Sequence, residues 1–254
     1  MSGKDFGQAT PPTLVADALD AALAARAAQT GRAELDVVDV GAGTGGFAVQ
    51  LAARGHHVTV VDPSPDALAA ARWRAAELGV TLTAVQGEAG DLAGLVGEGA
   101  ADLVVCHNVL EYVDSPAAAM SAIARVLRVG GTVSVLAANV VAAVLQRALA
   151  GRYDEARRLL DLHAPSAQPA APAPVESLTG HRRFTLPELT ALIEGAGLLV
   201  GEAQGIRVFA GLLPGAGADP NAADALRDLE AAAAGYPALR DIAARLHVVA
   251  FRGS

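Results

Sequence analysis

Short apolar runs alternate with longer segments of mixed polarity from Leu14 to Ala138. Nearly continuous apolar runs are typical of strands that are buried on both faces of a parallel sheet. We expect such strands at Leu35–Val40, His56–Asp62, Val80–Gly87, Ala101–Cys106 and Thr132–Ala138. We expect helices at Leu14–Ala28, Gly45–Arg54, Ser64–Leu78 and Ser115–Leu127, with a break at Gly130-Gly131 before the fifth strand. This alternation predicts an α/β fold with a doubly wound, mostly parallel sheet.

The chain after Ala138 is less regular. Val140–His163 is expected to be helical, and the stretch APSAQPAAPAPV, residues 164–175, holds four prolines that preclude a regular helix. This stretch predicts a loop, a lid or a flexible linker. The last helices and strands are expected at Thr185–Gly195, Leu198–Arg207, Asp219–Ala234 and Leu246–Arg252. The expected architecture is therefore a single domain, residues 1–254, with a seven-stranded sheet.

A glycine-rich turn follows the first expected strand. Gly41, Gly43 and Gly46 satisfy the pattern G-x-G-x-x-G between a strand and a helix. Glycines there let the backbone come close to a ligand, and the helix N-terminus offers free amide groups. Asp62 closes the next strand, where an acid can accept hydrogen bonds from both hydroxyls of a ribose. Together these residues indicate a cofactor of the adenosine type.

Asp39 lies two residues before the first glycine of this turn. A dinucleotide would bring a diphosphate to the turn, and a negative charge at Asp39 would repel it. S-adenosylmethionine carries a positive ammonium group and a positive sulfur, which the same acid would attract. Asp39 could also cap the turn by accepting hydrogen bonds from backbone amides, and the two interpretations are compatible.

Composition narrows the class of protein further. The 254 residues are 52% hydrophobic, which is enough for a large core. The net charge of −8 argues against tight non-specific binding of nucleic acid, though not against a local arginine patch. Cys106 is the only cysteine, which excludes an internal disulfide or a cysteine-based zinc site, and no metal is expected at His56 and His57. Without a signal-peptide pattern or an apolar run of about 20 residues, we expect a cytoplasmic protein.

Four segments between Leu35 and Leu136 resemble motifs of class I S-adenosylmethionine-dependent methyltransferases. They are VVDVGAGTGGFAVQLAARGHHVTVVDPSPDAL, VQGEAGDL, ADLVVCHNVLEYVDSP and RVLRVGGTVSVL. The resemblance implies a Rossmann-like fold, S-adenosyl-L-methionine as cofactor and methyl transfer. Together with the glycine turn, it implies cofactor contacts at Asp39, Gly41, Ala42, Gly43, Asp62, Pro63, Glu88, Ala89, Gly90 and His107.

A closer resemblance is to the bacterial tRNA 5-carboxymethoxyuridine methyltransferases, a family that methylates a carboxylate on a wobble uridine. It rests on CHNVLEYV, AGRYD at Ala150–Asp154, GIRVF at Gly205–Phe209 and the ending LHVVAFR. Two features of that family are missing here, namely an arginine around Thr13–Ala16 and a lysine run where this chain has APSAQPAAPAP. From Arg147 to Arg183, six arginines oppose four acids, which is a small surplus for binding phosphates.

Several residues beyond the expected strands are candidates for contact with a methyl acceptor. They are Glu111, Tyr112, Asn139 and Arg207, while Arg182 and Arg183 could close over an anion or lie solvated. Asn139 is equally suited to cap a helix, and Arg207 to form an ion pair. His107 is a weak candidate for a general base, and it could instead contact the cofactor, position the acceptor or pack in the core. Cys106 and Trp73 are expected to be packing residues.

These observations predict a methyltransferase that acts on an oxygen, either a carboxylate or a hydroxyl, with a tRNA wobble uridine as the acceptor that the resemblance implies. A carboxylate is ionised at neutral pH and needs no base, whereas a hydroxyl can require one. The alternatives are a small-molecule acceptor such as a secondary metabolite, an NAD-dependent oxidoreductase, and a cofactor-binding protein without catalysis. Residues 140–184 are expected to form an insertion that covers the acceptor.

Overall fold

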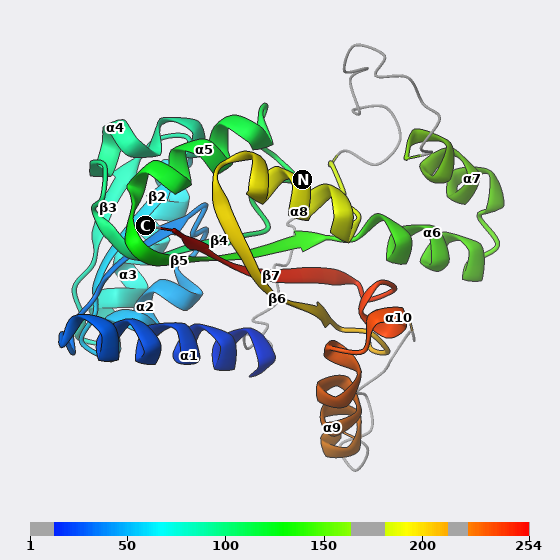
Figure 1. Ribbon diagram of the computed structural model, residues 1–254, viewed down its shortest axis with the longest axis horizontal. Helices are drawn as coiled ribbons and strands as arrows, with labels where there is room; N and C mark the ends of the chain where they lie inside the picture. The colour runs from blue at the N-terminus through cyan, green and yellow to red at the C-terminus, as the bar shows by residue number, and fades with distance from the viewer. Residues whose placement is uncertain (1–12, 164–180, 213–222, 254) are drawn as a thin grey trace.

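A seven-stranded sheet runs through the part of the chain that the computed structural model describes, residues 13–163, 181–212 and 223–253 (Figure 1). The strand order is β3-β2-β1-β4-β5-β7-β6, and β7 runs antiparallel to both neighbours while the other described pairs are parallel. The strands are β1 (Asp36–Val40), β2 (His57–Asp62), β3 (Thr83–Gln86), β4 (Ala101–His107), β5 (Leu127–Ala138), β6 (Leu198–Ile206) and β7 (Arg245–Arg252). The predicted mostly parallel sheet is therefore confirmed.

Helices cover both faces of this sheet (Figure 1). One face carries α1 (Thr13–Thr30), α2 (Gly46–Ala53) and α3 (Pro65–Glu77), and the other carries α4 (Leu92–Val96), α5 (Pro116–Val126) and α8 (Leu186–Gly195). Consecutive residues of a strand point to opposite faces. Val37 accordingly joins the buried cluster beneath α1, α2 and α3, whereas Val38 joins the cluster beneath α4, α5 and α8. The core thus has two apolar layers.

Side-chain caps followed by proline begin three of these helices. Ser64 caps α3 and Ser115 caps α5, in each case by accepting a hydrogen bond from a backbone amide of the first turn. Thr185 and Glu188 form a reciprocal capping box at the start of α8. Proline is tolerated in the first turn because the amide hydrogen that it lacks has no intrahelical partner there. Local sequence therefore sets the starts of these helices, close to their expected positions.

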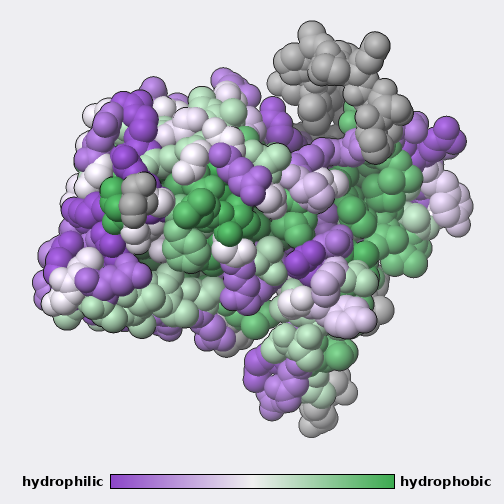
Figure 2. All heavy atoms as spheres, in the orientation of Figure 1, coloured by the Kyte–Doolittle hydropathy of each residue, from purple (hydrophilic) through white to green (hydrophobic). Residues whose placement is uncertain are grey.

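The segment expected as one helix, Val140–His163, is two helices. α6 (Val140–Leu149) and α7 (Tyr153–Leu162) are separated at Gly151, whose φ of +74° is a left-handed conformation that glycine adopts without strain. The pair extends beyond the end of β5 (Figure 1), and apolar side chains reach the surface over it (Figure 2). The proline-rich stretch 164–175 lies outside the described residues.

The fifth strand begins earlier than expected. β5 starts at Leu127, so Gly130 and Gly131 lie inside the strand instead of breaking the chain before it. Gly130 has a φ of +74°, and the register between β4 and β5 shifts in this region. A Cβ at Gly131 would lie 2.8 Å from the carbonyl oxygen of Arg128. The two glycines permit an irregular strand that continues past them.

Some short elements and one side chain also differ from expectation. The structure adds η1 (Ala89–Asp91), α4 and α10 (Pro237–Arg240), which are too short to show a helical period in the sequence. Trp73 is 65% exposed because α3 packs on the sheet through its opposite side, whereas Cys106 is buried as expected. The helix expected at Asp219–Ala234 is described from α9 (Ala223–Ala234) onward.

Candidate active site

A pocket of about 340 Å³ opens at the carboxyl edge of the sheet. The strand order reverses between β1 and β4, and ligands of open α/β sheets bind beyond such switch points. The volume lies in the range of small-molecule sites. The pocket is lined by Val40, Gly41, Val61, Asp62, Pro63, Gly87, Glu88, Ala89, Asn108, Val109, Tyr112 and Val113.

The glycine turn forms one wall of this pocket. Gly41 has a φ of +64°, and a Cβ there would lie 2.5 Å from the side chain of Val109, which also lines the pocket. Gly45 has a φ of +73°, and a Cβ there would lie 2.9 Å from the methyl group of Ala71. Both conformation and space therefore require glycine at these two positions.

The Asp62 carboxylate is held in place at the end of β2. Its Oδ2 accepts a hydrogen bond from the Gly43 amide at 3.0 Å, and its Oδ1 accepts one from the Ser64 amide at 2.9 Å. Each oxygen keeps a further lone pair. Because Asp62 also lines the pocket, this carboxylate can accept hydrogen bonds from two neighbouring hydroxyl groups of a ligand.

Asp39 is a second buried acid beside the turn, with 4% of its surface exposed. Within the residues that the structure describes, its carboxylate receives no hydrogen bond, and the Gly43 amide that could have capped it bonds Asp62 instead. Burial, together with the negative charge of Asp62, raises the pKa of Asp39 to about 7. A buried acid without partners suits a cationic ligand group and would repel a diphosphate.

The pocket brings together part of the predicted cofactor set. Gly41, Asp62, Pro63, Glu88 and Ala89 line it, and Gly43 supports it through the bond to Asp62. The predicted contacts that do not line it are Asp39, Ala42, Gly43, Gly90 and His107. Contact of any of these residues with a cofactor stays a prediction.

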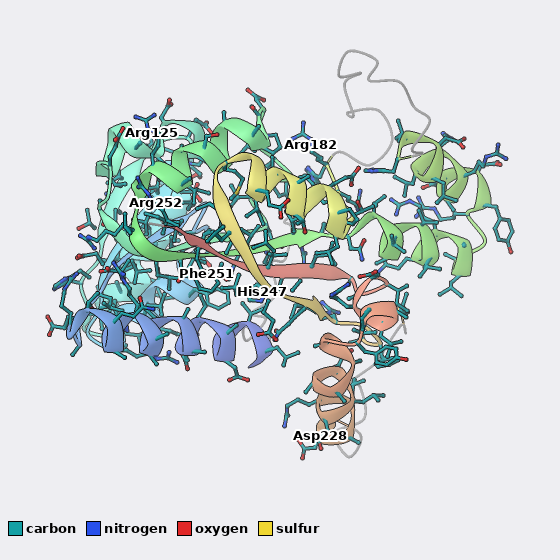
Figure 3. The ribbon with its side chains drawn as sticks, in the orientation of Figure 1. Arg125, Arg182, Asp228, His247, Phe251 and Arg252 are labelled. Carbon is teal, nitrogen blue, oxygen red and sulfur yellow. The ribbon has the colours of Figure 1, made fainter. Side chains whose placement is uncertain are left out.

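His107 lies at the end of β4 in a chain of three side chains. Its Nε2 is hydrogen-bonded to Ser134 Oγ at 2.8 Å, and the same oxygen is 2.8 Å from Nε2 of His247 on β7 (Figure 3). Phe47 packs edge-on against its ring, and its Nδ1 is buried without a partner among the described residues. Burial, with the charge of His247, lowers the pKa of His107 to about 3. Such an imidazole is a weak proton acceptor, which argues against the base role.

The four acceptor candidates lie in different surroundings. Tyr112 lines the pocket and is 62% exposed, whereas Glu111 is buried and its Oε1 accepts a hydrogen bond from the Ala138 amide at 2.7 Å. Arg207 is exposed on the loop after β6, with a φ of +60°. Only Tyr112 of these candidates borders the described pocket directly.

Asn139 caps a helix, which was the alternative to contact with the acceptor. Its Oδ1 accepts a hydrogen bond from the Val141 amide at 2.9 Å, which caps α6. Its Nδ2 donates to the carbonyl oxygens of Asp241 at 2.9 Å and Ala243 at 2.8 Å. With 2% of its surface exposed and its side-chain groups bonded within the protein, Asn139 is not available to a substrate, which corrects the expected acceptor contact.

Sequence reasoning missed several residues of this region. Asn108 lines the pocket at a φ of +57°, a conformation that asparagine tolerates better than most residues. Its Oδ1 accepts a hydrogen bond from Arg245, which lies 137 residues away along the chain. The position of Asn108 directly after a strand was the only sequence signal for its place at the pocket. No local pattern could have indicated its contact with Arg245 or the contact of Ser134 with His247.

Across residues 13–163, 181–212 and 223–253, no group of three or more histidine, cysteine, aspartate or glutamate residues is placed to hold a metal ion. No helix within these same ranges is both long enough and apolar enough to cross a membrane.

Known proteins resemble this chain both in sequence and in fold. The methyltransferase domain family matches residues 38–135. Ubiquinone biosynthesis O-methyltransferase of Aeromonas salmonicida is 32% identical over 171 residues, 67% of this chain and 65% of that protein. The tRNA 5-carboxymethoxyuridine methyltransferase of Escherichia coli K12 is 33% identical over 129 residues, 50% of this chain and 49% of that protein. The chain thus matches between about half and two thirds of the length of these relatives.

A solved structure resembles this chain in fold. Magnesium protoporphyrin IX methyltransferase from Synechocystis PCC 6803, with bound S-adenosylhomocysteine (SAH), superposes with a TM-score of 0.58 at 15% identity, covering 97% of this chain and 90% of that one. The sheet, the glycine turn and the pocket define the fold class of the class I methyltransferases. Residues 38–135 of the chain match the methyltransferase domain family, and the described chain has the fold of this solved methyltransferase.

Proposed function

We propose that this protein transfers a methyl group from S-adenosylmethionine to an oxygen of an acceptor. The observation that carries the proposal is the pair of buried acids at the glycine turn. Asp62 suits the hydroxyls of a ribose, and the partnerless Asp39 suits a positive charge in the methionine part. When bound, S-adenosylmethionine supplies a methyl group that is activated by a positively charged sulfur.

The remaining wall of the pocket fits the same ligand. Gly41 leaves room for close approach of the ligand, and Glu88 and Ala89 follow β3, where the family resemblance puts residues that flank the adenine. We assign Pro63 to this site as well. Ala42, Gly43, Gly90 and His107 remain proposed contacts around it.

The described residues favour an acceptor that is already ionised. His107 has a pKa of about 3 and is a weak base. A carboxylate acceptor needs no proton removed, so the protein has only to hold it in line with the methyl group. The name of the Aeromonas salmonicida relative describes an O-methyltransferase. Tyr112, Glu111 and Arg207 are the proposed contacts to this acceptor.

Two acceptors are compatible with the site. A tRNA wobble uridine is supported by the family resemblance and by the Escherichia coli relative. A small molecule is supported by the net charge of −8, by the missing lysine run and by the Aeromonas relative, whose name refers to ubiquinone biosynthesis. We propose a cytoplasmic, single-domain enzyme in which α6 and α7 cover the acceptor.

Mass spectrometry of tRNA nucleosides from a deletion strain and its parent tests the acceptor. If a methyl ester on a wobble uridine disappears on deletion and returns with the intact gene but not with an Asp62→Ala gene, tRNA is the acceptor. An unchanged nucleoside profile would assign a small-molecule acceptor. Absence of methyl transfer from S-adenosylmethionine to both tRNA and a small-molecule extract would contradict the proposed activity.

A further inference from the structure

Arg183 and Arg245 lie near the buried acid Glu111 at the carboxyl edge of the sheet, and Arg147 lies near Arg183. Arg245 begins β7, where it is paired with Ala138 of β5 and Ile206 of β6. Arg183 directly precedes Phe184, which forms a bridge with Asn139 after β5, and Arg147 lies on α6, which starts there. The fold therefore brings to one edge side chains that are widely separated in sequence. These three residues, Arg147, Arg183 and Arg245, are called the arginine cluster below.

Arg183 forms no close ion pair within the described residues, and Glu111 is the acid whose charge acts on it. It is half-buried, and its Nη1 donates to the His181 carbonyl oxygen at 3.4 Å. Burial lowers the pKa of Arg183, and the positive charges of Arg147 and Arg245 also lower it, while the charges of Glu111 and Tyr112 act in the opposite direction. A guanidinium that is partly desolvated and repelled by two others is electrostatically unfavourable without an anion nearby.

The acids near the arginine cluster do not balance it. The Glu111 side chain is 3% exposed, and the Nη1 of Arg245 lies 3.7 Å from its Oε1, which already accepts the Ala138 amide. Burial raises the pKa of Glu111, which weakens it as a counter-charge. Glu155 lies 3.4 Å from Arg147 but also binds Arg152 at 2.5 Å. The cluster therefore keeps a surplus of positive charge in a protein whose net charge is −8.

The arginine cluster adjoins the cofactor pocket. The segment before α8 is bound to the pocket wall, because the Arg182 amide donates to the Glu111 carbonyl oxygen at 3.2 Å and its Nη1 donates to the Val113 carbonyl oxygen at 2.9 Å (Figure 3). The Tyr112 and His181 rings are 4.3 Å apart. Tyr112 and Val113 line the pocket, so Arg183 stands beside its rim.

We propose that Arg147, Arg183 and Arg245 form an anion subsite that binds a carboxylate or phosphate group of the methyl acceptor. The inference rests on the proposed function, since it assigns the acceptor's charge. The planar fork of arginine pairs with both kinds of oxyanion through two parallel hydrogen bonds. An anion bound there would relieve the repulsion within the cluster and hold the acceptor at the rim of the pocket.

The test is anion binding to the full chain saturated with SAH. Inorganic phosphate and acetate are titrated separately at constant ionic strength, and the arginine side-chain NMR signals are followed. We expect saturable binding of at least one anion, weakened about tenfold or more in Arg183→Gln, which corresponds to about 1.4 kcal/mol. Arg183→Lys keeps the positive charge but not the planar fork of the guanidinium. Its anion affinity should lie between those of the unmodified chain and Arg183→Gln. Tighter binding of phosphate points to a phosphate-bearing acceptor, and tighter binding of acetate to a carboxylate.

Two comparisons make the result decisive. Arg227→Gln, an exposed arginine on α9 that pairs with Asp224, should bind the anions as the unmodified chain does. Arg183→Gln should keep its affinity for SAH, which shows that it folds. Absence of saturable anion binding, or equal anion affinities of the unmodified chain and Arg183→Gln, would contradict the proposed subsite. Failure of the unmodified chain to bind SAH would instead count against the proposed function.

Discussion

At the scale of single residues, Asp39 and Asp62 lie at the same turn in unlike environments. Asp62 receives two backbone hydrogen bonds, whereas Asp39 receives none within the described chain. Burial and the charge of Asp62 raise the pKa of Asp39 to about 7. An acid left in this state gains most from a positively charged ligand, which is the physical basis for choosing S-adenosylmethionine over a dinucleotide.

The raised pKa predicts proton-linked binding of S-adenosylmethionine. At pH 6 most free protein carries a protonated Asp39, and a positive ligand requires the ionised form. The affinity should therefore rise about tenfold between pH 6 and pH 8 and level off above that range. Calorimetry at the two pH values measures this change. Asp39→Asn should bind more weakly and without this dependence, and an affinity of the unmodified chain that is equal at both pH values would refute the assignment.

His107 and His247 predict a loss of stability in acid. Burial lowers their pKa values to about 3 and about 4, below the ordinary value of 6.5. As the pH falls below 6.5, these histidines take up a proton in the unfolded chain before they do so in the folded protein. The folded state is therefore not penalised at pH 7 and becomes less stable as the pH falls toward 4. Between pH 7 and pH 4.5, the free energy of unfolding of His247→Gln should fall by about 2 kcal/mol less than that of the unmodified chain.

Urea titrations of both proteins at the two pH values measure this difference. Ser134→Ala, which removes the hydroxyl between the two rings but keeps both histidines, serves as the control and should retain most of the acid-dependent loss. Identical pH dependence of the unmodified chain and His247→Gln would show that this histidine does not titrate as described.

At the scale of elements, Asp102 ties α1, β4 and β5 together at the amino end of the sheet. Its fully buried carboxylate accepts hydrogen bonds from Arg26, Arg32 and Arg128, at 3.0, 3.0 and 2.8 Å. Removal of Asp102 would leave Arg26 without its acidic partner, while Arg32 and Arg128 would keep Asp36 alone. Asp102→Ala should lower the free energy of unfolding by about 3 kcal/mol, measured in urea. Asp224→Ala, which breaks an exposed pair, should change it little, and an equally small effect of Asp102→Ala would contradict this role.

Elements that depend on local sequence could be predicted, and those that depend on distant contacts could not. Continuous apolar runs identified the strands, and Ser64 and Ser115 with their following prolines marked two helix starts. The break at Gly151 was missed because a glycine is tolerated within a helix, and packing decides whether the chain turns there. Gly130 and Gly131 were expected to break the chain before the fifth strand, yet β5 runs through them because β4 pairs with it on both sides of the two glycines.

The same division applies to the candidate site. Gly41 belongs to the glycine turn, and Asp62 is the acid at the end of the next strand. This local pattern indicated a cofactor of the adenosine type, and both residues line the pocket. The contact between Asn108 and Arg245 and the bond from Asn139 to Ala243 join segments far apart in sequence, so no local pattern carries them. Asn139 was left undecided between a cap and an acceptor contact for this reason.

At the scale of the whole molecule, charge is distributed unevenly. The chain carries a net charge of −8, yet the arginine cluster lies at the carboxyl edge of the sheet beside the cofactor pocket. The overall charge disfavours a long polyanion, while the cluster favours a single oxyanion at the site. This arrangement fits a methyl acceptor that is recognised through one charged group.

The central claim is that the pocket at the glycine turn binds S-adenosylmethionine through Asp62. Titration calorimetry with SAH and with NAD tests it most directly, on the unmodified chain, on Asp62→Ala and on Asp66→Ala, an exposed acid close by on α3. We predict that SAH binds and NAD does not, that Asp62→Ala weakens SAH binding at least about tenfold, and that Asp66→Ala leaves it unchanged. Binding of NAD in place of SAH, or equal SAH affinity with and without the Asp62 carboxylate, would contradict the account.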